Sequence, residues 1–277
     1  MSDQLLSVVI PVYNGDATII ATLDAIVGYL SPRRPFEILV VDDGSRDRTA
    51  SLVSAYAVQH RAITLIRFAR NCGKGAAVRC GALAATGSLI AFCDADLPIL
   101  VAEIETLVSV LGRGCDVAIA SRALPQSAIP TQPSLIRRLT SRAFGCLVRA
   151  LFKLSFRDTQ CGFKGFRRDA ARAVFSRARI DGFAFDVELL VLAGRLGCRI
   201  DEFPVRWENP LLSTVSVRTH AWPICADLWR IARNLRRDVY GLAPVSGRTV
   251  AWHAGADQDT RASMLVEQGV ASGSRDG

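Results

Sequence analysis

Two aspartates near the middle of the chain stand where an apolar strand should end. In the stretch LIAFCDADLPI, residues 89–99, Asp94 and Asp96 follow the apolar run with one small residue between them. If the backbone stays extended, their side chains point to the same side and the carboxylates repel each other. A divalent cation relieves this repulsion, because Mg²⁺ and Mn²⁺ bind carboxylates together with phosphate oxygens. The pattern predicts a metal site, with two solvated loop acids as the alternative.

A glycine-rich turn, NCGKGAAVRCG at residues 71–81, is a second polar feature. Val78 stands where the dinucleotide-binding fingerprint needs a glycine, and the Walker nucleotide-binding pattern is absent. A glycine-rich turn that opens a helix can still present backbone N–H groups to a phosphate, and Lys74 or Arg79 would add positive charge.

The stretch VVDDGS, residues 40–45, is the third candidate because it ends a strand-like run on Asp42 and Asp43. Gly44 and Ser45 suit an ordinary turn and helix cap. A carboxylate at this position could instead accept a hydrogen bond from a nucleobase N–H or a ribose hydroxyl. The stretch alone leaves both interpretations open.

Alternating strands and helices place these features in space. Short β-rich runs cover about residues 5–12, 36–43, 63–68, 87–94 and 115–122. Helix-patterned segments between them cover about residues 17–30, 47–59, 74–85 and 100–112. This alternation predicts an α/β fold with a mostly parallel sheet and helices on both of its faces. Ligands of such sheets bind at the carboxyl ends of the strands, so five polar stretches should share one rim: PVYNG, DDGS, NCGKG, DAD and SR.

The pattern changes after about residue 132. We expect a basic amphipathic helix over residues 135–154, then a strand, turn and helix near 158–175, a helix near 185–197 and a strand near 198–207. Within residues 223–241, one helical stripe is apolar and consists of Ile224, Leu228, Ile231, Leu235 and Val239. This helix either packs on its own domain or lies on a membrane surface. Residues 244–277 are expected to form a disordered tail.

The positive charge of the chain is concentrated in one block. The net charge is +8, and residues 117–157 contain no acidic side chain. The basic residues of this block are Arg122, Arg137, Arg138, Arg142, Arg149, Lys153 and Arg157. They form either a solvated helical face or a surface that binds phosphate or an anionic membrane. A nucleic-acid partner is not expected, because aromatic side chains that stack on bases do not alternate with these cations.

Composition argues against several other classes of protein. No apolar run approaches the roughly 18 residues of a transmembrane helix. The N-terminal residues MSDQLLSVVIPVYNG lack the basic start of a signal peptide. The eight cysteines form neither a CxxC motif nor a cluster with histidine, which argues against zinc and for reduced thiols in the cytoplasm.

Seven stretches together resemble one enzyme family. In chain order they are SVVIPVYNG, VVDDGSRDRTA, NCGKGAAVRCG, DADLP, SRA, DTQCGFKGF and FAFDVELL. Over about residues 5–240 the chain resembles glycosyltransferase family 2, whose GT-A fold is a Rossmann-like α/β sheet. The likeness is greatest to the branch that acts on polyprenyl phosphates, and DTQCGFK followed by AFDVELL resembles the dolichyl-phosphate β-glucosyltransferases more than the mannose synthases. The resemblance implies a GT-A domain over residues 1–243, with a nucleotide-sugar half (about 1–122) and an acceptor half (123–243) that carries membrane-interfacial helices.

The resemblance also implies roles for matching residues. The nucleoside of the donor would be held by Pro11, Tyr13, Asp42 and Asp43, with Lys74 nearby. Mg²⁺ or Mn²⁺ on the donor diphosphate would be held by Asp94 and Asp96. The acceptor phosphate would be contacted by Arg122, Arg137 and Ser141. Further candidates fall in the signatures of the second half and are Asp158, Gln160, Phe163, Lys164, Asp186 and Glu188.

The implied reaction is an inverting, metal-dependent transfer of a hexose to a polyprenyl or dolichyl phosphate. The expected donor is UDP-glucose, the catalytic residues are Asp94, Asp96 and Arg122, and the enzyme would associate peripherally with the cytoplasmic face of a membrane. GDP-mannose as donor is an alternative. A hydroxyl acceptor is another, with Asp158 or Asp186 as the base, and a non-catalytic nucleotide-binding protein is a third.

Two positions depart from the family pattern. Pro98 stands where relatives often carry a further metal ligand, so water or another residue must complete the metal shell. Residues 212–214, LST, align with a GSK loop near the acceptor and lack its lysine.

Overall fold

The computed structural model describes residues 4–129, 135–207 and 217–242. Its strands are β1 (Leu6–Val12), β2 (Phe36–Asp42), β3 (Ile63–Arg67), β4 (Leu89–Phe92), β5 (Val117–Ser121), β6 (Lys164–Arg167) and β7 (Ile200–Pro204). Its helices are α1 (Ile19–Leu30), α2 (Thr49–Gln59), α3 (Lys74–Ala84), α4 (Glu103–Gly112), α5 (Leu135–Phe152), α6 (Arg168–Phe175), α7 (Phe185–Arg195) and α8 (Val217–Arg236). The predicted strands and helices therefore occur in the expected order, with ends shifted by a few residues.

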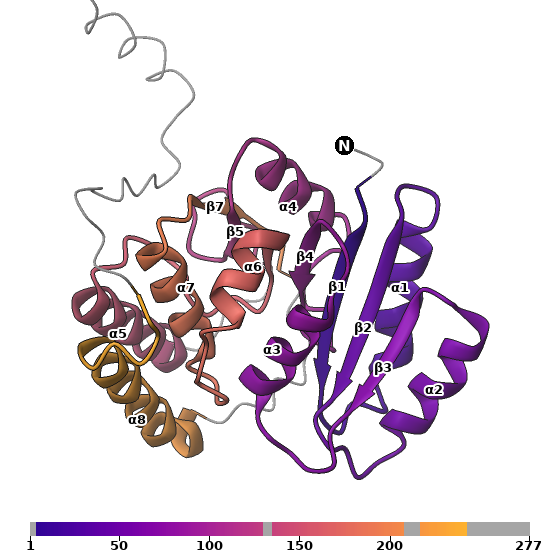
Figure 1. Cartoon of the computed structure of the whole chain (residues 1–277), viewed down its shortest axis with the longest axis horizontal. Coiled ribbons are helices and arrows are strands. Elements are labelled where there is room, and N and C mark those ends of the chain that lie inside the picture. The colour runs from indigo at the N-terminus through magenta and orange to yellow at the C-terminus, as the bar shows by residue number, and fades with distance from the viewer. Residues whose placement is uncertain (1–3, 130–134, 208–216, 243–277) are drawn as a thin grey trace, which may run out of the picture.

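The strands form one sheet in the order β3-β2-β1-β4-β6-β5-β7 (Figure 1). The first four are parallel, as the strand–helix alternation predicts, and β5 is parallel to β7. Strand β6 lies between β4 and β5 and runs antiparallel to both. The predicted α/β fold with a mostly parallel sheet is confirmed, and β6 is the exception to the parallel direction.

Alternating side chains of the buried strands make a core on each face of the sheet. Every residue of β1 is buried. Val8 and Ile10 join the cluster that contains apolar side chains of α1 and α4, whereas Val9 joins the cluster with α3, α6 and α7. A strand covered on both faces needs apolar residues at every position, which is why β1 reads as a continuous apolar run.

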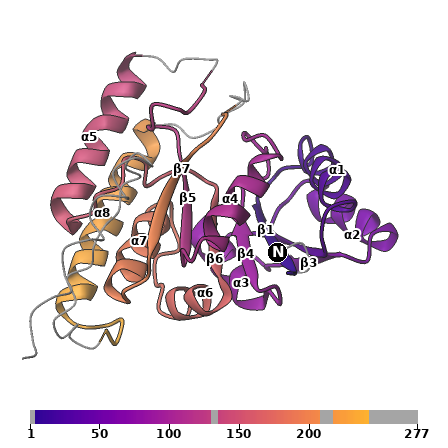
Figure 2. The same ribbon diagram turned by 90° about the horizontal axis from the view of Figure 1, so that it is seen from above.

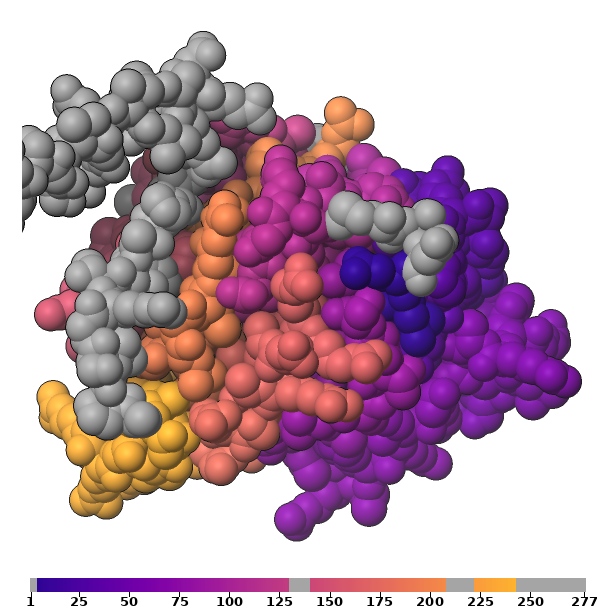
Figure 3. All heavy atoms as spheres, turned by 45° about the horizontal axis from the view of Figure 1, so that its top comes forward, coloured from indigo at the N-terminus to yellow at the C-terminus, as the bar shows by residue number. Residues whose placement is uncertain are grey.

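The two halves of the chain form one continuous body. Figure 3 shows the N-terminal half, in indigo and purple, directly against the salmon and orange segments of the second half. In Figure 2, α5 and α8 lie side by side at one edge of the molecule, with α1 and α2 at the opposite edge. No helix in the described part of the chain is long and apolar enough to cross a membrane.

Helix α8 resolves one alternative that the sequence leaves open. Leu228 and Ile231 are buried, and Ile224 and Leu235 pack against the same core cluster. Val239 is 47% exposed and lies just beyond the helix. The apolar stripe of this helix therefore packs on its own domain, so only its other face, which carries the exposed Trp222 and Trp229, can contact another surface. The predicted tail at 244–277 and the LST loop at 212–214 lie outside the described residues.

Candidate active site

The strand register gathers the polar motifs at one edge of the sheet. Val12, at the end of β1, pairs with Asp42 at the end of β2, and Val9 pairs with Phe92 at the end of β4. The chain continues from these ends into the residues that carry Tyr13, Asp43 and Asp94 (Figure 1). Parallel neighbours end on the same side, so the predicted features that follow β1, β2 and β4 share one rim.

Asp42 and Asp43 are both buried but face different partners. Asp42 accepts a hydrogen bond from the backbone N–H of Ser45 at 2.9 Å, and Arg67 Nε lies 3.2 Å from its Oδ2. That buried Oδ2 accepts no hydrogen bond in the described part of the chain. Asp43 instead accepts hydrogen bonds from the N–H groups of Cys72 (2.6 Å) and Gly73 (2.9 Å). Asp42 Oδ2 thus has Arg67 as an ion-pair partner but accepts no hydrogen bond, whereas Asp43 fixes the glycine-rich turn.

The backbone donors of the glycine-rich turn are already used. The N–H groups of Cys72 and Gly73 go to Asp43, and Gly75 N–H donates to the carbonyl of Asp181 at 2.7 Å. Gly73 has a φ of 103°, and a Cβ there would overlap the same carbonyl. Only glycine suits this left-handed conformation and close approach. The turn therefore does not offer these N–H groups to a phosphate, contrary to one possibility that the sequence leaves open.

Lys74, the first residue of α3, points its charge at Asp94. Its Nζ lies 2.5 Å from Asp94 Oδ1, and both side chains are partly exposed. Burial alone would lower the pKa of Lys74, but the nearby carboxylates of Asp94 and Asp186 outweigh it and raise the pKa. The other oxygen of Asp94 packs against Gly162, where a Cβ would overlap the carboxylate. Asp94 is thus fixed from two sides by residues far away in the sequence.

The two aspartates lie in a turn that follows β4, and the assumption of an extended backbone is wrong. Strand β4 ends at Phe92, and Leu97 N–H donates to the carbonyl of Asp94 at 3.1 Å. Leu97 has a φ of 40°, and Thr22 Oγ1 donates to the carbonyl of Ala95 at 2.8 Å. Asp96 remains exposed beside Asp94. Burial and then the charge of Asp94 raise the pKa of Asp96, as expected for two neighbouring acids.

This pair suits a hard divalent cation. Carboxylate oxygens are the donors that Mg²⁺ and Mn²⁺ prefer, and these ions commonly bind one or two carboxylates and complete their shell with phosphate and water. No set of three or more His, Cys, Asp or Glu side chains within the described residues could enclose an ion. Pro98 is buried and has no ligating atom. The rest of a metal shell would therefore come from the ligand and solvent.

Arg122 follows β5 and forms a two-pronged ion pair with Asp158. Its Nε and Nη2 donate to the two carboxylate oxygens at 2.7 and 3.0 Å, and its guanidinium lies 4.8 Å from the centre of the Trp207 ring. Burial alone would raise the pKa of Asp158, but Arg122 outweighs it and lowers the pKa. Glu202 on β7 accepts hydrogen bonds from the N–H groups of Arg157 and Asp158 and so fixes this loop.

Lys164 and Asp186 form a second, fully buried ion pair. Lys164 Nζ lies 2.5 Å from Asp186 Oδ1 and 2.6 Å from the carbonyl of Cys161. The Lys164 side chain is 0% exposed and that of Asp186 is 5% exposed. Burial raises the pKa of Asp186 even though Lys164 opposes the shift. Both of these candidate side chains are therefore buried, and neither is accessible to a ligand from solvent.

Glu188 lies away from the aspartate pair and stabilises another loop. It is fully buried, and it accepts hydrogen bonds from the N–H groups of Arg179 and Ile180 and from the Tyr240 hydroxyl at 2.7 Å. The loop that it fixes continues into Asp181, the residue against which the glycine-rich turn packs. Glu188 therefore connects the end of α8 to the turn that carries Lys74.

The remaining candidates are scattered. Pro11 is buried in β1, and Tyr13 is 45% exposed beside the rim. Gln160 donates its N–H to Asp158, and its Nε2 is buried without a hydrogen-bond partner in the described residues. Phe163 is a core residue. Ser141 is exposed on α5, and the side chain of Arg137 lies outside the described residues.

Sequence reasoning missed three residues that shape the rim. Gly162 contacts Asp94, Trp207 stacks on Arg122, and the backbone of Asp181 receives Gly75. A glycine inside an otherwise apolar signature is a signal for close approach and could have pointed to Gly162. Trp207 and Asp181 carry no such signal, because their partners are distant in the sequence.

The rim and fold can now be compared with known proteins. The profile of glycosyl transferase family 2 matches residues 7–175, which run from β1 to the end of α6. The chain belongs to glycosyl transferase family 2. The predicted membership is therefore confirmed, and the matched segment contains the aspartate pair, Arg122 and Lys164.

Two curated relatives agree with this family assignment. The dolichyl-phosphate beta-glucosyltransferase of Drosophila melanogaster is 38% identical over 73% of this chain and 66% of its own length. The human one is 36% identical over 73% of this chain and 67% of its own length. The chain thus spans about two thirds of the length of the curated relatives it matches.

The fold is also that of a solved bacterial enzyme. A structure of glucosyl-3-phosphoglycerate synthase from Mycobacterium tuberculosis, in complex with Mn²⁺, UDP-glucose and phosphoglyceric acid, superimposes with a TM-score of 0.57. The match covers 87% of this chain and 82% of that one at 19% identity. It confirms the predicted GT-A fold.

Proposed function

We propose that this enzyme transfers glucose from UDP-glucose to the phosphate of a dolichyl or related polyprenyl phosphate, with inversion at the anomeric carbon. The Drosophila and human relatives are both named dolichyl-phosphate beta-glucosyltransferase. The bacterial structural neighbour was solved with UDP-glucose. The reaction would take place where the enzyme associates peripherally with the cytoplasmic face of a membrane.

The donor side of the rim suits a nucleotide diphosphate. The buried Oδ2 of Asp42 pairs with Arg67 but accepts no hydrogen bond, and it would accept the N–H of a uracil ring. The exposed ring of Tyr13, which follows the end of β1, would contact the nucleoside. Asp94 and Asp96 would hold Mg²⁺ or Mn²⁺, which supplies Lewis-acid stabilisation of the charge on the departing nucleoside diphosphate. Lys74, already beside Asp94, adds a second positive charge close to the diphosphate.

The observation that carries the choice of acceptor is that both possible base carboxylates are engaged. Asp158 is bound on both oxygens by Arg122, and Asp186 is buried against Lys164. A hydroxyl acceptor needs a base to take its proton, whereas a phosphate acceptor is already anionic. In the proposed step a phosphate oxygen attacks the anomeric carbon, and the bond from that carbon to the diphosphate breaks with its electron pair on UDP.

Arg122 would hold the acceptor phosphate. Asp158 binds its Nε and Nη2, and within the described residues Nη1 keeps its donors for an anionic ligand. The planar guanidinium is kept in place by the carboxylate on one edge and the Trp207 ring on its face. Arg137 and Ser141 on α5 stay predicted contributors to the same phosphate site.

The proposal is tested by offering labelled UDP-glucose with different acceptors. Dolichyl phosphate, dolichol and 3-phosphoglycerate are compared in the presence of Mg²⁺ or Mn²⁺. We expect label in the lipid extract only with dolichyl phosphate, and its loss in Asp94→Asn but not in Asp169→Asn, an exposed control on α6. Transfer to dolichol or to phosphoglycerate, with none to dolichyl phosphate, would overturn the proposal.

A further inference from the structure

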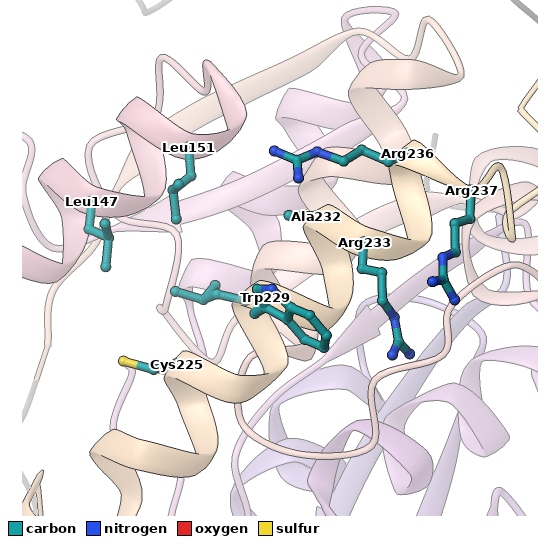
Figure 4. Close-up of a pocket in the computed structure, with 9 residues that line it drawn as sticks. Leu147, Leu151, Cys225, Trp229, Ala232, Arg233, Arg236 and Arg237 are labelled. Carbon is teal, nitrogen blue, oxygen red and sulfur yellow. The ribbon is translucent and has the colours of Figure 1, made fainter.

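A groove separates the second half of α5 from α8 and contains none of the rim residues. Its volume is about 450 Å³. Figure 4 shows Leu147 and Leu151 extending from α5 toward α8, which carries Trp229 and three arginines. We call this surface the α5–α8 groove.

The floor of the groove is apolar and accessible. Leu147 and Leu151 are 43% and 53% exposed, and they are four residues apart, so they lie on the same face of α5. Trp229 on α8 is 62% exposed. Trp222, seven residues earlier on the same face of α8, is 82% exposed. Large apolar side chains that gather at one exposed place mark an interaction surface, whereas single ones need no explanation.

The rim of the groove is cationic and lacks counter-charges. Arg233 lies over the Trp229 ring with its guanidinium carbon 5.0 Å from the ring centre, and its buried Nε has no acceptor in the described residues. Arg236 and Arg237 complete the rim, and no carboxylate of the described chain forms an ion pair with any of the three. Arg230 on the same helix, by contrast, is paired with Asp227.

We propose that the α5–α8 groove binds an anionic phospholipid of the membrane surface. The headgroup phosphate would lie near Arg233 and Arg237, whose side chains extend in the same direction in Figure 4, with Arg236 adding charge on the side of α5. An acyl chain would cover Leu147, Leu151 and Trp229. Charge complementarity identifies this occupant, because a neutral lipid leaves the arginines unpaired and a soluble anion leaves the apolar floor in water. None of the rim residues lines the groove, so the proposal does not depend on which sugar or acceptor the enzyme uses.

Vesicle sedimentation of the full chain tests the charged part. Vesicles of phosphatidylcholine alone are compared with vesicles that also contain phosphatidylglycerol. We expect binding to the anionic vesicles only, and a loss of about thirtyfold in Arg236→Glu/Arg237→Glu. The double variant Arg172→Glu/Arg195→Glu changes exposed arginines of α6 and α7 by the same net charge, and it should bind nearly as wild type. Equal losses in the two double variants would overturn the proposal, because the attraction would then be unspecific.

Quenching by brominated acyl chains tests the apolar part. Phosphatidylglycerol with brominated chains should quench the tryptophan fluorescence of wild type, and Trp229→Phe should reduce that quenching more than Trp222→Phe, while circular dichroism stays unchanged in both. Unchanged quenching in Trp229→Phe would contradict the placement of the chain.

Two other occupants are distinguished by the same samples. If dolichyl phosphate in phosphatidylcholine vesicles supports the same binding, and Arg236→Glu/Arg237→Glu abolishes transfer to it, the groove belongs to the acceptor and the proposal is wrong. If the enzyme dimerises in solution and Leu147→Glu makes it monomeric, the groove is a contact between copies, which also overturns it.

Discussion

The sheet rim and the α5–α8 groove are both proposed to bind phosphate groups, but they arrange positive charge differently. At the rim three cations each have a carboxylate partner: Lys74 with Asp94, Arg122 with Asp158, and Lys164 with Asp186. In the groove three arginines stand without one in the described residues. Paired charges hold side chains in fixed directions, which suits a reaction centre. Unpaired charges at a surface attract any anionic headgroup that also offers an apolar chain.

This difference predicts how the two regions respond to substitution. Removing a partner at the rim leaves an uncompensated charge and disturbs chemistry or folding. Removing a groove arginine leaves the rest of the protein intact and weakens surface binding alone. The predictions below test the rim side of this comparison, from the largest effect to the smallest.

The largest effect is expected for Asp94→Asn. The change removes a proposed metal ligand and the partner of Lys74, so the leaving diphosphate loses stabilisation. We expect the turnover number to fall about a thousandfold, measured by transfer of labelled glucose. Asp169→Asn is the matched control, and a drop of less than tenfold in Asp94→Asn would contradict the role given to Asp94.

Lys164→Met should damage stability more than any groove substitution. It leaves Asp186 buried without its cation, which costs about 3–5 kcal/mol of unfolding free energy. Urea unfolding measures this loss. Lys164→Met/Asp186→Leu should recover much of it, because an apolar pair replaces the buried charges. A single variant as stable as wild type would show that the pair is not essential to the core.

Gly162→Ala should weaken the metal site without removing a ligand. The added methyl group would overlap the Asp94 carboxylate and turn it away. We expect the metal concentration for half-maximal activity to rise about tenfold or more. Gly28→Ala is the control, since a Cβ at Gly28 meets no atom within 4 Å. An unchanged metal dependence in Gly162→Ala would exclude the contact as a constraint on Asp94.

The smallest effect concerns pH and the Arg122–Asp158 pair. Because Arg122 lowers the pKa of Asp158, the carboxylate stabilises the fold above its unfolded pKa of about 3.9, and this contribution is lost as the pH falls through the lower folded value. The stability difference between wild type and Asp158→Asn should thus stay nearly constant from pH 7 to pH 5. Urea unfolding at several pH values measures it, and a difference that shrinks already at pH 6 would contradict the assignment.

Local sequence patterns predicted most of the strands and helices but not the direction of every strand. The apolar runs of β1 and β2 and the N-terminal position of Lys74 on α3 follow from sequence periodicity. The antiparallel direction of β6 does not, because a four-residue strand has the same pattern in either direction. The apolar stripe of α8 was also ambiguous, because a helix that packs on its own domain and a helix that lies on a membrane both have one apolar face.

Within the site, the residue types were predictable and the partners were not. The sequence located Asp94 and Asp96 but not the turn at Leu97. It located Asp158 but not its pairing with Arg122, which lies 36 residues away. The exposure of Trp222 and Trp229 on α8 was also not predictable, because it depends on which face of the helix packs against the core. Long-range packing decides these contacts, and no local pattern encodes it.

The most direct test of the proposed function is the identity of the sugar that the enzyme transfers. Purified enzyme is incubated with dolichyl phosphate, divalent metal and either UDP-glucose or GDP-mannose, and the lipid product is analysed by mass spectrometry and by its anomeric configuration. We predict a glucosyl phosphate lipid formed with inversion from UDP-glucose and no product from GDP-mannose. A mannosyl lipid, or a product that retains configuration, would contradict it.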